Sequence, residues 1–302
     1  MSFSFFKRLR TLLLIFLLLF MTVAFTRTRT FWGPGHDIVV GAKFSQDSQI
    51  LSEIVSQVIE HRTPYRVKRR FNLEGSAMAF HAIMSGGVDM YVEYTGTALA
   101  EILKSPSIVD PEKGFETIRE EFLSRFDLIA CPLLGSSNAY VFVTRGDSPL
   151  NTIADMASSL ETLKVGLDPE FANRSEADNI AHHYHFVPSF NPVIMEHTLL
   201  YVSLTRGALD VISGYEADSF ISASNIKILS DKKGILPSYE SFPVVRAATL
   251  KHCPQLRGVF SDLSKAISSD DVSALSAQLE KKDKNLYDCV SKLLKEKKII
   301  DD

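Results

Sequence analysis

The sequence predicts an α/β protein in which helices cover mainly parallel sheets. From Asp37 onward, apolar strand-like segments alternate with segments of helical periodicity, which is typical of parallel sheets with helices on their faces. The chain has 302 residues, of which 45% are hydrophobic, so it is long and apolar enough for two substantial cores. We therefore expect two α/β domains.

The first elements follow from local patterns. A buried strand is expected at 37–43, and apolar residues at helical spacing predict a helix over about 46–62. A second strand is expected at 65–71, and the next helix, with Ser76 as a plausible N-cap, ends at Gly86-Gly87. The later strands are expected at 88–94, 128–131, 139–144, 163–167, 209–213, 226–229 and 237–245. The later helices are expected at 98–104, 111–125, 152–160, 195–206, 254–268, 271–281 and 284–297, with one more ending at 181.

The segment 88–100 is the centre of this pattern. Met90, Val92 and Tyr94 alternate with polar residues as in a strand, and Thr95-Gly96-Thr97 then turns the chain into a helix. Open α/β sheets bind ligands at the carboxyl ends of their strands, where helix N-termini offer free N–H groups. We expect Tyr94 and Thr97 at such an edge. The alternative is that Tyr94 is a core tyrosine and Thr95 only a helix cap.

The charge and the cysteine content argue against nucleic-acid binding and against a zinc site. The formal net charge is −3, and no basic run is interleaved with aromatic residues, so nucleic acid is not an expected partner. Cys131, Cys253 and Cys289 match no zinc-binding spacing. We interpret them as small apolar residues, with one disulfide between two of them as the alternative.

Motifs for catalysis or cofactor binding are missing from the sequence. It contains no phosphate-binding Gly-x4-Gly-Lys-Ser/Thr loop, no Gly-x-Ser-x-Gly elbow and no His-Glu-x-x-His pair. In the run 182–185 (His-His-Tyr-His), adjacent histidines on a helix point in different directions, so an exposed helix end is expected rather than a metal site. We predict no catalytic residue, no metal and no cofactor.

The N-terminus resembles an export signal. Lys7, Arg8 and Arg10 precede an apolar run at 12–25, which is short for a membrane-spanning helix. Bulky residues stand where a small-residue cleavage site is usual, and no cysteine follows for a lipid anchor. We predict that residues 1–30 are a signal peptide or an uncleaved membrane anchor. The rest of the chain is then expected in the periplasm or on the outer face of the cytoplasmic membrane.

Seven segments together resemble one family. They are 41–43 (GAK), 72–76 (NLEGS), 93–97 (EYTGT), 138–140 (NAY), 170–174 (EFANR), 210–215 (DVISGY) and 239–246 (YESFPVVR). In this order they resemble the substrate-binding proteins of osmoprotectant ABC importers, of the glycine betaine/carnitine/choline type. The resemblance implies a two-lobed periplasmic-binding-protein fold, type II-like, with the ligand cleft between the lobes. The alternation of strands and helices, with candidate ligand turns in both halves, predicts lobe one at 37–133 plus 240–302 and lobe two at 138–239, joined by two crossover strands.

The resemblance also implies an aromatic cage. A quaternary ammonium group has no N–H to donate, and aromatic faces bind it through cation–π attraction. Tyr94, Tyr215 and Tyr239 fall on the cage positions, and Tyr140 is expected near them.

A second part of the site would bind the carboxylate of a betaine or carnitine. Arg174 falls on the position of an arginine whose fork suits a carboxylate. Lys43 and Thr97 are expected as secondary anion contacts, and Glu170 either faces the cation or orients Arg174.

We therefore predict an extracytoplasmic solute-binding protein that delivers a quaternary-ammonium or zwitterionic osmolyte to the permease of an ABC importer in the cytoplasmic membrane. Departures from the family pattern at 44–48, at Ser136 and at 216–219 touch the rim of the cleft and would alter ligand choice. Two alternatives stay open. The same fold could bind another amino-acid-like solute or act as a sensor, or the chain could be an unrecognised α/β enzyme.

Overall fold

The computed structural model describes residues 37–105, 110–187, 189–216, 218, 220–221, 225–237, 239–279 and 284–301. The predicted signal or anchor at 1–30 lies outside these ranges. Within them, no helix combines the length and the apolar character that crossing a membrane requires.

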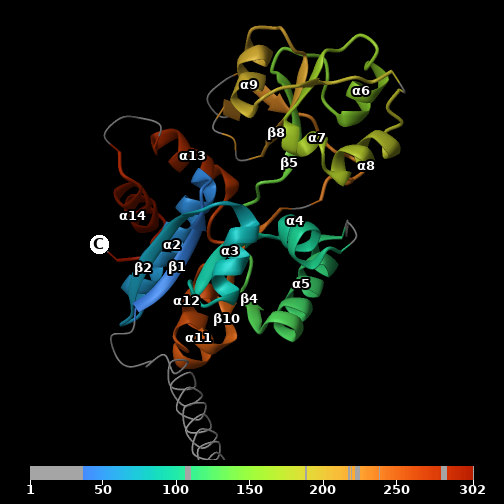
Figure 1. The fold of residues 1–302 in the computed structure, drawn as a ribbon. Coiled ribbons are helices and arrows are strands. Elements are labelled where there is room, and N and C mark those ends of the chain that lie inside the picture. Colours follow the sequence, from blue (N-terminus) through green and yellow to red (C-terminus); the bar gives the residue numbers. More distant parts are fainter. Residues whose placement is uncertain are drawn as a thin grey trace, which may run out of the picture. The chain divides into compact units, whose positions relative to one another are not determined.

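The first sheet contains strands from both ends of the described chain (Figure 1). Its strands are β1 (Asp37–Lys43), β2 (Arg66–Leu73), β3 (Met90–Tyr94), β4 (Leu128–Ala130) and β10 (Ser241–Arg246), in the order β2-β1-β3-β10-β4. β1 runs parallel to β2 and β3, whereas β10 is antiparallel to β3 and β4. The returning strand β10 therefore occupies an interior position beside β3.

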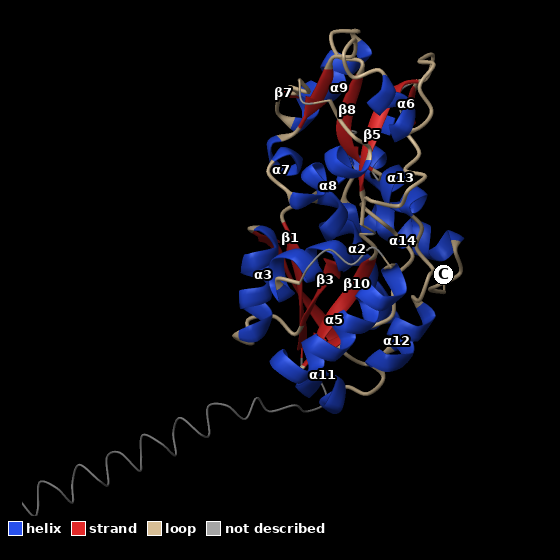
Figure 2. Ribbon diagram, turned by 90° about the vertical axis from the view of Figure 1, so that its right-hand side faces the viewer, coloured by secondary structure: helices blue, strands red, loops and turns tan. Residues whose placement is uncertain are grey.

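Helices cover this sheet. They are α2 (Gln46–Arg62), α3 (Gly75–Met84), α4 (Thr95–Thr97), the π-helix η1 (Ala98–Leu103), α5 (Pro111–Phe126), α11 (Ala247–His252), α12 (Leu256–Asp262), α13 (Ser269–Leu279) and α14 (Leu286–Glu296). The long helix α2 packs on β1, β2 and β3, and α13 and α14 lie beside it in both views (Figures 1 and 2). A second set, α3, η1 and α5, encloses a core cluster that includes Tyr91, Phe122 and Phe242.

The second sheet repeats this arrangement with other strands. β5 (Tyr140–Arg145), β6 (Val165–Leu167), β7 (Val193–Ile194), β8 (Val211–Tyr215) and β9 (Ile226–Ile228) follow the order β7-β6-β8-β5-β9. β6 is parallel to β7 and β8, and β5 is antiparallel to β8 and β9. The helices are α6 (Ile153–Ser158), α7 (Pro169–Ala172), α8 (Ser175–His183) and α9 (His197–Thr205). Leu200, Tyr201 and Ile212 lie in the core between α9 and this sheet.

Two segments, 131–139 and 229–240, carry the chain from one sheet to the other and back. They are hydrogen-bonded to each other, since the Asn138 N–H donates to the Tyr239 carbonyl at 3.0 Å and the Ser241 N–H to the Ser136 carbonyl at 2.9 Å. The hydroxyl groups of Ser136 and Ser241 lie 2.6 Å apart in a buried contact. The α/β prediction is thus confirmed, with one sheet on each side of a paired connection.

Helix starts differ most from expectation. Thr95-Gly96-Thr97 is the first turn of a helix rather than a separate turn, and extended Tyr94 is its N-cap. Ser76 is not an N-cap, because Glu74 takes that place and Ser76 lies inside α3, where its hydroxyl accepts from Lys43 Nζ at 3.2 Å. The helix expected to end at 181 is broken at Arg174, the N-cap of α8.

Some strands begin at other residues than the sequence predicts, because pairing with a neighbouring strand sets their bounds. β8 begins at Val211 rather than Leu209 because Val211 pairs with Val165, the first residue of β6. The two-residue strand β7 and the short helix α11 were not expected. In the part of the chain that the structure describes, all three cysteines are buried and free, so no two of them form the disulfide that the sequence left as an alternative.

Candidate functional site

A cavity of about 580 Å³ is lined by residues from both sheets and from the connection between them. This volume falls in the range that small-molecule sites occupy, roughly 300–1,000 Å³. All eight predicted site residues line it: Lys43, Tyr94, Thr97, Tyr140, Glu170, Arg174, Tyr215 and Tyr239. Other lining residues with polar side chains were not predicted as site residues, among them Asp47, Glu101, Asn138, His197 and Asp218.

Three of the four tyrosines form one ring cluster. The ring centroids of Tyr140 and Tyr215 are 4.6 Å apart, and those of Tyr140 and Tyr239 are 6.0 Å apart at 88°. Tyr140 and Tyr215 meet because β5 and β8 are antiparallel and these two residues are direct cross-strand partners. Their hydroxyl oxygens are 2.9 Å apart, and Phe171 lies behind Tyr140 at 4.8 Å. Burial raises the pKa of all three phenols above the usual value, so they stay neutral.

Tyr239 comes from the returning connection and packs on the backbone of α4. A Cβ atom placed on Gly96 would lie only 2.5–2.7 Å from ring carbons of Tyr239. The glycine of the Thr95-Gly96-Thr97 segment is therefore required for this ring position. The Tyr239 hydroxyl donates to Glu176 at 2.7 Å and accepts from Arg174 Nη1 at 3.1 Å.

Tyr94 lies on the first-sheet side of the cavity. Its hydroxyl donates to Asp47, which also accepts from Asn138 Nδ2 at 3.2 Å. Burial, followed by the charge of Asp47, holds the pKa of Tyr94 well above its usual value. The ring faces Lys43 Nζ at 5.0 Å from its centroid. Asp47 thus places a carboxylate beside an aromatic face.

Lys43 is engaged by its own protein. Its Nζ lies 2.6 Å from Glu93 Oε1, and the side chains of Lys43 and Glu93 are only 9% and 0% exposed. Glu93 Oε1 also accepts from the Tyr94 N–H at 2.9 Å, while Oε2 finds no hydrogen-bond donor among the described residues. The buried pair fixes the wall that carries Tyr94. Thr97 lies on the cavity wall in the first turn of the helix that begins at Thr95.

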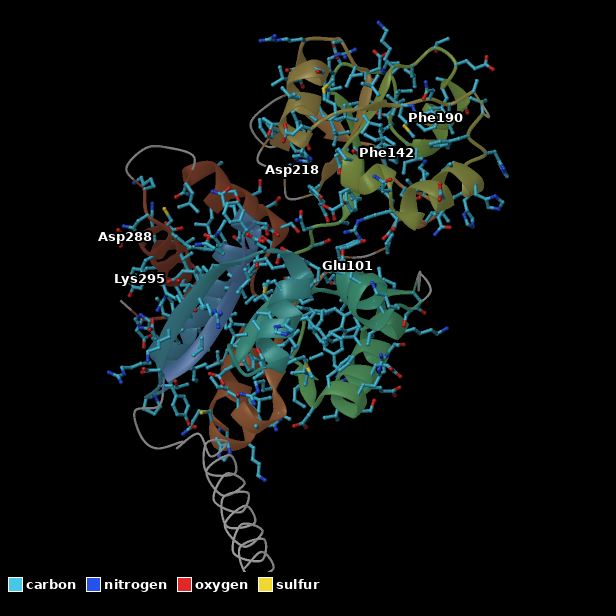
Figure 3. The ribbon with its side chains drawn as sticks, in the orientation of Figure 1. Glu101, Phe142, Phe190, Asp218, Asp288 and Lys295 are labelled. Carbon is cyan, nitrogen blue, oxygen red and sulfur yellow. The ribbon has the colours of Figure 1, made fainter. Side chains whose placement is uncertain are left out.

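Arg174 lies between carboxylates and aromatic rings. Its Nη2 donates to Glu170 and to Glu101, the latter at 3.1 Å, and Nη1 is 3.8 Å from Glu176. Its Cζ is 5.3 Å from the ring centroid of Tyr140 and 6.0 Å from that of Tyr239. Of the two roles considered for Glu170, these contacts favour orienting Arg174. Figure 3 labels two of the lining carboxylates, Glu101 on η1, which follows α4, and Asp218 below α9.

Arg174 lies at the break between two short helices, α7 and α8. Asp168 caps α7 by accepting from the N–H groups of Glu170 and Phe171, and Pro169 follows at a helix position where its missing N–H costs nothing. α7 lasts one turn, and Arg174 then caps α8 with an extended backbone. Asp168 is itself anchored, since the Ser213 hydroxyl donates to it at 2.9 Å.

His197 and Asp218 form a pair on the second-sheet side. His197 Nε2 is 3.2 Å from Asp218 Oδ1, and the Tyr201 hydroxyl donates to Asp218 Oδ2 at 2.6 Å. The His197 ring lies 5.2 Å from that of Tyr215. No sequence motif pointed to His197, whereas Asp218 belongs to the segment where the chain departs from the family pattern.

The electrostatics of the cavity favour a cation. Four lining carboxylates, Asp47, Glu101, Glu170 and Asp218, face two lining cations, Lys43 and Arg174. The excess of negative charge and the aromatic faces together suit a large, diffuse cation. No group of three or more potential ligands that could hold a metal ion occurs among the described residues, and His182 and His183 are exposed at the end of α8.

Residues 36–296 match the family described as the substrate binding domain of ABC-type glycine betaine transport systems. The chain belongs to this family. It is a substrate-binding protein of ABC importers, as its sequence predicted.

Relatives and solved structures agree with this membership. The carnitine transport binding protein OpuCC of Listeria monocytogenes is 31% identical over 257 residues, which cover 83% of each chain. The ergothioneine transport permease/ergothioneine binding protein EgtU of Helicobacter pylori is 30% identical over 80% of this chain, and the matched part is 44% of that longer protein. A solved glycine betaine/carnitine/choline ABC transporter structure is 28% identical, with a TM-score of 0.80, and is matched over 88% of this chain and 100% of that chain. The two-lobed periplasmic-binding-protein fold is thereby confirmed.

Proposed function

We propose that this protein binds an osmolyte with a quaternary ammonium group, such as choline, carnitine or glycine betaine, and presents it to the permease of an ABC importer. The observation that carries the proposal is the aromatic cluster of Tyr140, Tyr215 and Tyr239 in a cavity that Tyr94 also lines. Neutral phenol rings offer π faces, and each face contributes roughly 0.5–2 kcal/mol to binding a desolvated cation.

The site residues proposed are those of the sequence analysis, with Asp47 and Glu101 added. Tyr94, Tyr140, Tyr215 and Tyr239 would surround the cation, and Asp47 would complement its charge beside Tyr94. Arg174 would bind the carboxylate of a zwitterion with its fork after leaving the rings of Tyr140 and Tyr239, and Glu170 would orient it. Lys43 would act through its pair with Glu93 rather than as a direct anion contact.

We further propose that binding closes the cleft about the paired connection. Lobe one would comprise 37–133 plus 240–302, and lobe two 138–239, so Tyr94 and Tyr215 would reach the ligand from opposite lobes. Ligand would then select the closed form, whose outer surface a permease can recognise. The contact between Arg174 and Glu101 at 3.1 Å supports this, because it joins the two sides of the cavity.

The protein would act outside the cytoplasm, in the periplasm or on the outer face of the membrane, after export or anchoring through residues 1–30. It would bind reversibly and catalyse no reaction. A second ligand class follows from the relative named for ergothioneine, a compound that also carries a trimethylammonium group and a carboxylate. The same cage and the same arginine would serve both classes.

The test is a thermal-shift screen of the purified protein with choline, carnitine, glycine betaine, ergothioneine, proline and common amino acids. A cognate ligand at a hundredfold excess over Kd should stabilise the folded state by about 2.7 kcal/mol. Stabilisation by compounds with a trimethylammonium group, but not by proline or the amino acids, supports the proposal. A shift with amino acids alone, or with none of these compounds, contradicts it.

A further inference from the structure

His197 is placed to form another wall of the cation site. It is the first residue of α9, follows the N-cap Glu196, and lines the cavity. Its ring lies 5.2 Å from that of Tyr215 at 40°, and 5.5 Å from that of Tyr201 at 69°. The imidazole therefore continues the aromatic surface that Tyr140 and Tyr215 begin.

Asp218 holds this imidazole in one orientation. Its Oδ2 accepts from the Tyr201 hydroxyl at 2.6 Å and from the Tyr215 N–H at 2.7 Å, which fixes the carboxylate against β8. His197 Nε2 lies 3.2 Å from Oδ1 and 3.1 Å from Oδ2. With its proton on Nε2, neutral His197 donates to Asp218. Its Nδ1 is buried and has no hydrogen-bond partner in the part of the chain that the structure describes.

The charge on this pair depends on pH. Asp218 and the phenols of Tyr201 and Tyr215 contact the ring, and the carboxylates of Asp168 and Glu196 act on it by charge. Burial opposes protonation of His197, but the hydrogen bond and the charge of Asp218 outweigh it and raise the pKa of His197 above the usual 6.5. The pair carries one negative charge when His197 is neutral and none when it is protonated.

We propose that His197 contacts the bound ligand as part of the cation cage, and that its protonation weakens cation binding. The inference rests on the proposed function, because it assumes a quaternary ammonium ligand between these rings. The affinity is highest above the pKa of His197 and falls as the pH drops through it. One unit charge added beside the ligand in a partly hydrated site should weaken binding about tenfold.

The coupling is reciprocal, so binding must release protons. A cation beside His197 lowers its pKa, and near that pKa a fraction of a proton leaves for each ligand bound. Calorimetry of the wild-type protein in buffers with different ionisation enthalpies measures this number directly. Choline and glycine betaine are suitable probes because neither titrates between about pH 5.5 and 8.

The experiment compares wild type, His197→Gln and His197→Phe by calorimetry at pH 8 and pH 5.5. His183→Gln, which removes an exposed histidine at the end of α8, is the matched control. Wild type and the control should lose about tenfold in affinity at pH 5.5 and release protons on binding. His197→Phe should lose much less affinity than wild type between pH 8 and pH 5.5, and both His197 variants should release fewer protons.

The results that would overturn the inference either leave the proposed function standing or refute it as well. Equal pH dependence in His197→Phe and wild type, or no proton release by the wild type, refutes the role of His197 and leaves the proposed function standing. A wild-type protein that binds neither probe at either pH refutes the proposed function together with this inference. If both His197 variants fold poorly, an absence of proton release by the wild type still refutes the inference.

Discussion

Replacing Gly96 with alanine should weaken ligand binding at the candidate site while leaving the protein folded. The added Cβ would lie 2.5 Å from Cζ and 2.6–2.7 Å from the Cε atoms of Tyr239. Carbon atoms pack best at roughly 3.5–4.0 Å, so the ring must retreat by about 1 Å. That movement would strain the hydroxyl contacts of Tyr239 with Glu176 at 2.7 Å and with Arg174 at 3.1 Å.

Two opposing effects set the change in stability. Overpacking costs about 1–3 kcal/mol, whereas alanine in place of glycine in a helix contributes about 0.5–1 kcal/mol. We expect a net loss of unfolding free energy of about 0–2.5 kcal/mol. The loss of one aromatic face should weaken binding of the cognate ligand by about 1–2 kcal/mol, or roughly five- to thirtyfold.

Calorimetry and thermal unfolding of Gly96→Ala measure both quantities. Gly258→Ala in α12 is the matched control, because a Cβ there would meet no atom within 4 Å. The control should be slightly more stable and bind like wild type. The double variant Gly96→Ala/Tyr239→Ala should bind no worse than Tyr239→Ala alone. Normal binding by Gly96→Ala, or additive losses in the double variant, would refute the reasoning.

Three further substitutions test separate parts of the site. Arg174→Ala should weaken binding of glycine betaine by about 2–5 kcal/mol and of choline much less, and equal losses in calorimetry would exclude a carboxylate-binding role. Lys43→Met should cost about 3–5 kcal/mol of unfolding free energy because it leaves Glu93 charged and buried, and Lys43→Met/Glu93→Gln should recover part of it. An unchanged melting temperature for Lys43→Met would show that the pair contributes nothing. Tyr215→Phe should bind nearly as well as wild type because the π face remains, so a loss as large as that of Tyr215→Ala would argue against cation–π binding.

The tyrosines of the candidate site could be predicted because the family resemblance marks them and because they lie at strand ends or in the returning connection. Tyr94 and Tyr215 end β3 and β8, Tyr140 begins β5, and Tyr239 precedes β10. A residue at a strand end is located by the α/β pattern, and the cross-strand pairing of Tyr140 with Tyr215 then brings two distant residues together. The same holds for Gly96, whose position after β3 was evident from the sequence, although its contact with Tyr239 was not.

The charged partners could not be predicted, because long-range packing decides them. Every residue of β3 is buried, so the alternation of polar and apolar residues did not reveal that Glu93 pairs with Lys43, 50 residues earlier. Glu101 belongs to the π-helix η1, where helical spacing does not tell which side chains face the cavity. His197 reaches the cavity only because α9 packs beside β8.

The break between α7 and α8 is a helix boundary that the sequence did not predict. Helix-forming residues continue across 169–183, and the local signal for the break is only Asn173, the C-cap of α7, whose Nδ2 donates to the Pro169 carbonyl at 2.6 Å. The contacts of Arg174 with Glu101 and Tyr239 are tertiary, and they hold its backbone in the extended conformation that separates the two helices.

A crystal structure of the protein with the most strongly stabilising compound of the screen would show whether the four tyrosines bind the cationic group. We expect the ligand nitrogen to lie within about 6 Å of the ring centroids of Tyr94, Tyr140, Tyr215 and Tyr239, with the guanidinium of Arg174 displaced from the rings of Tyr140 and Tyr239. A ligand whose cationic group lies outside these rings, while Arg174 keeps its place over them, would contradict this expectation.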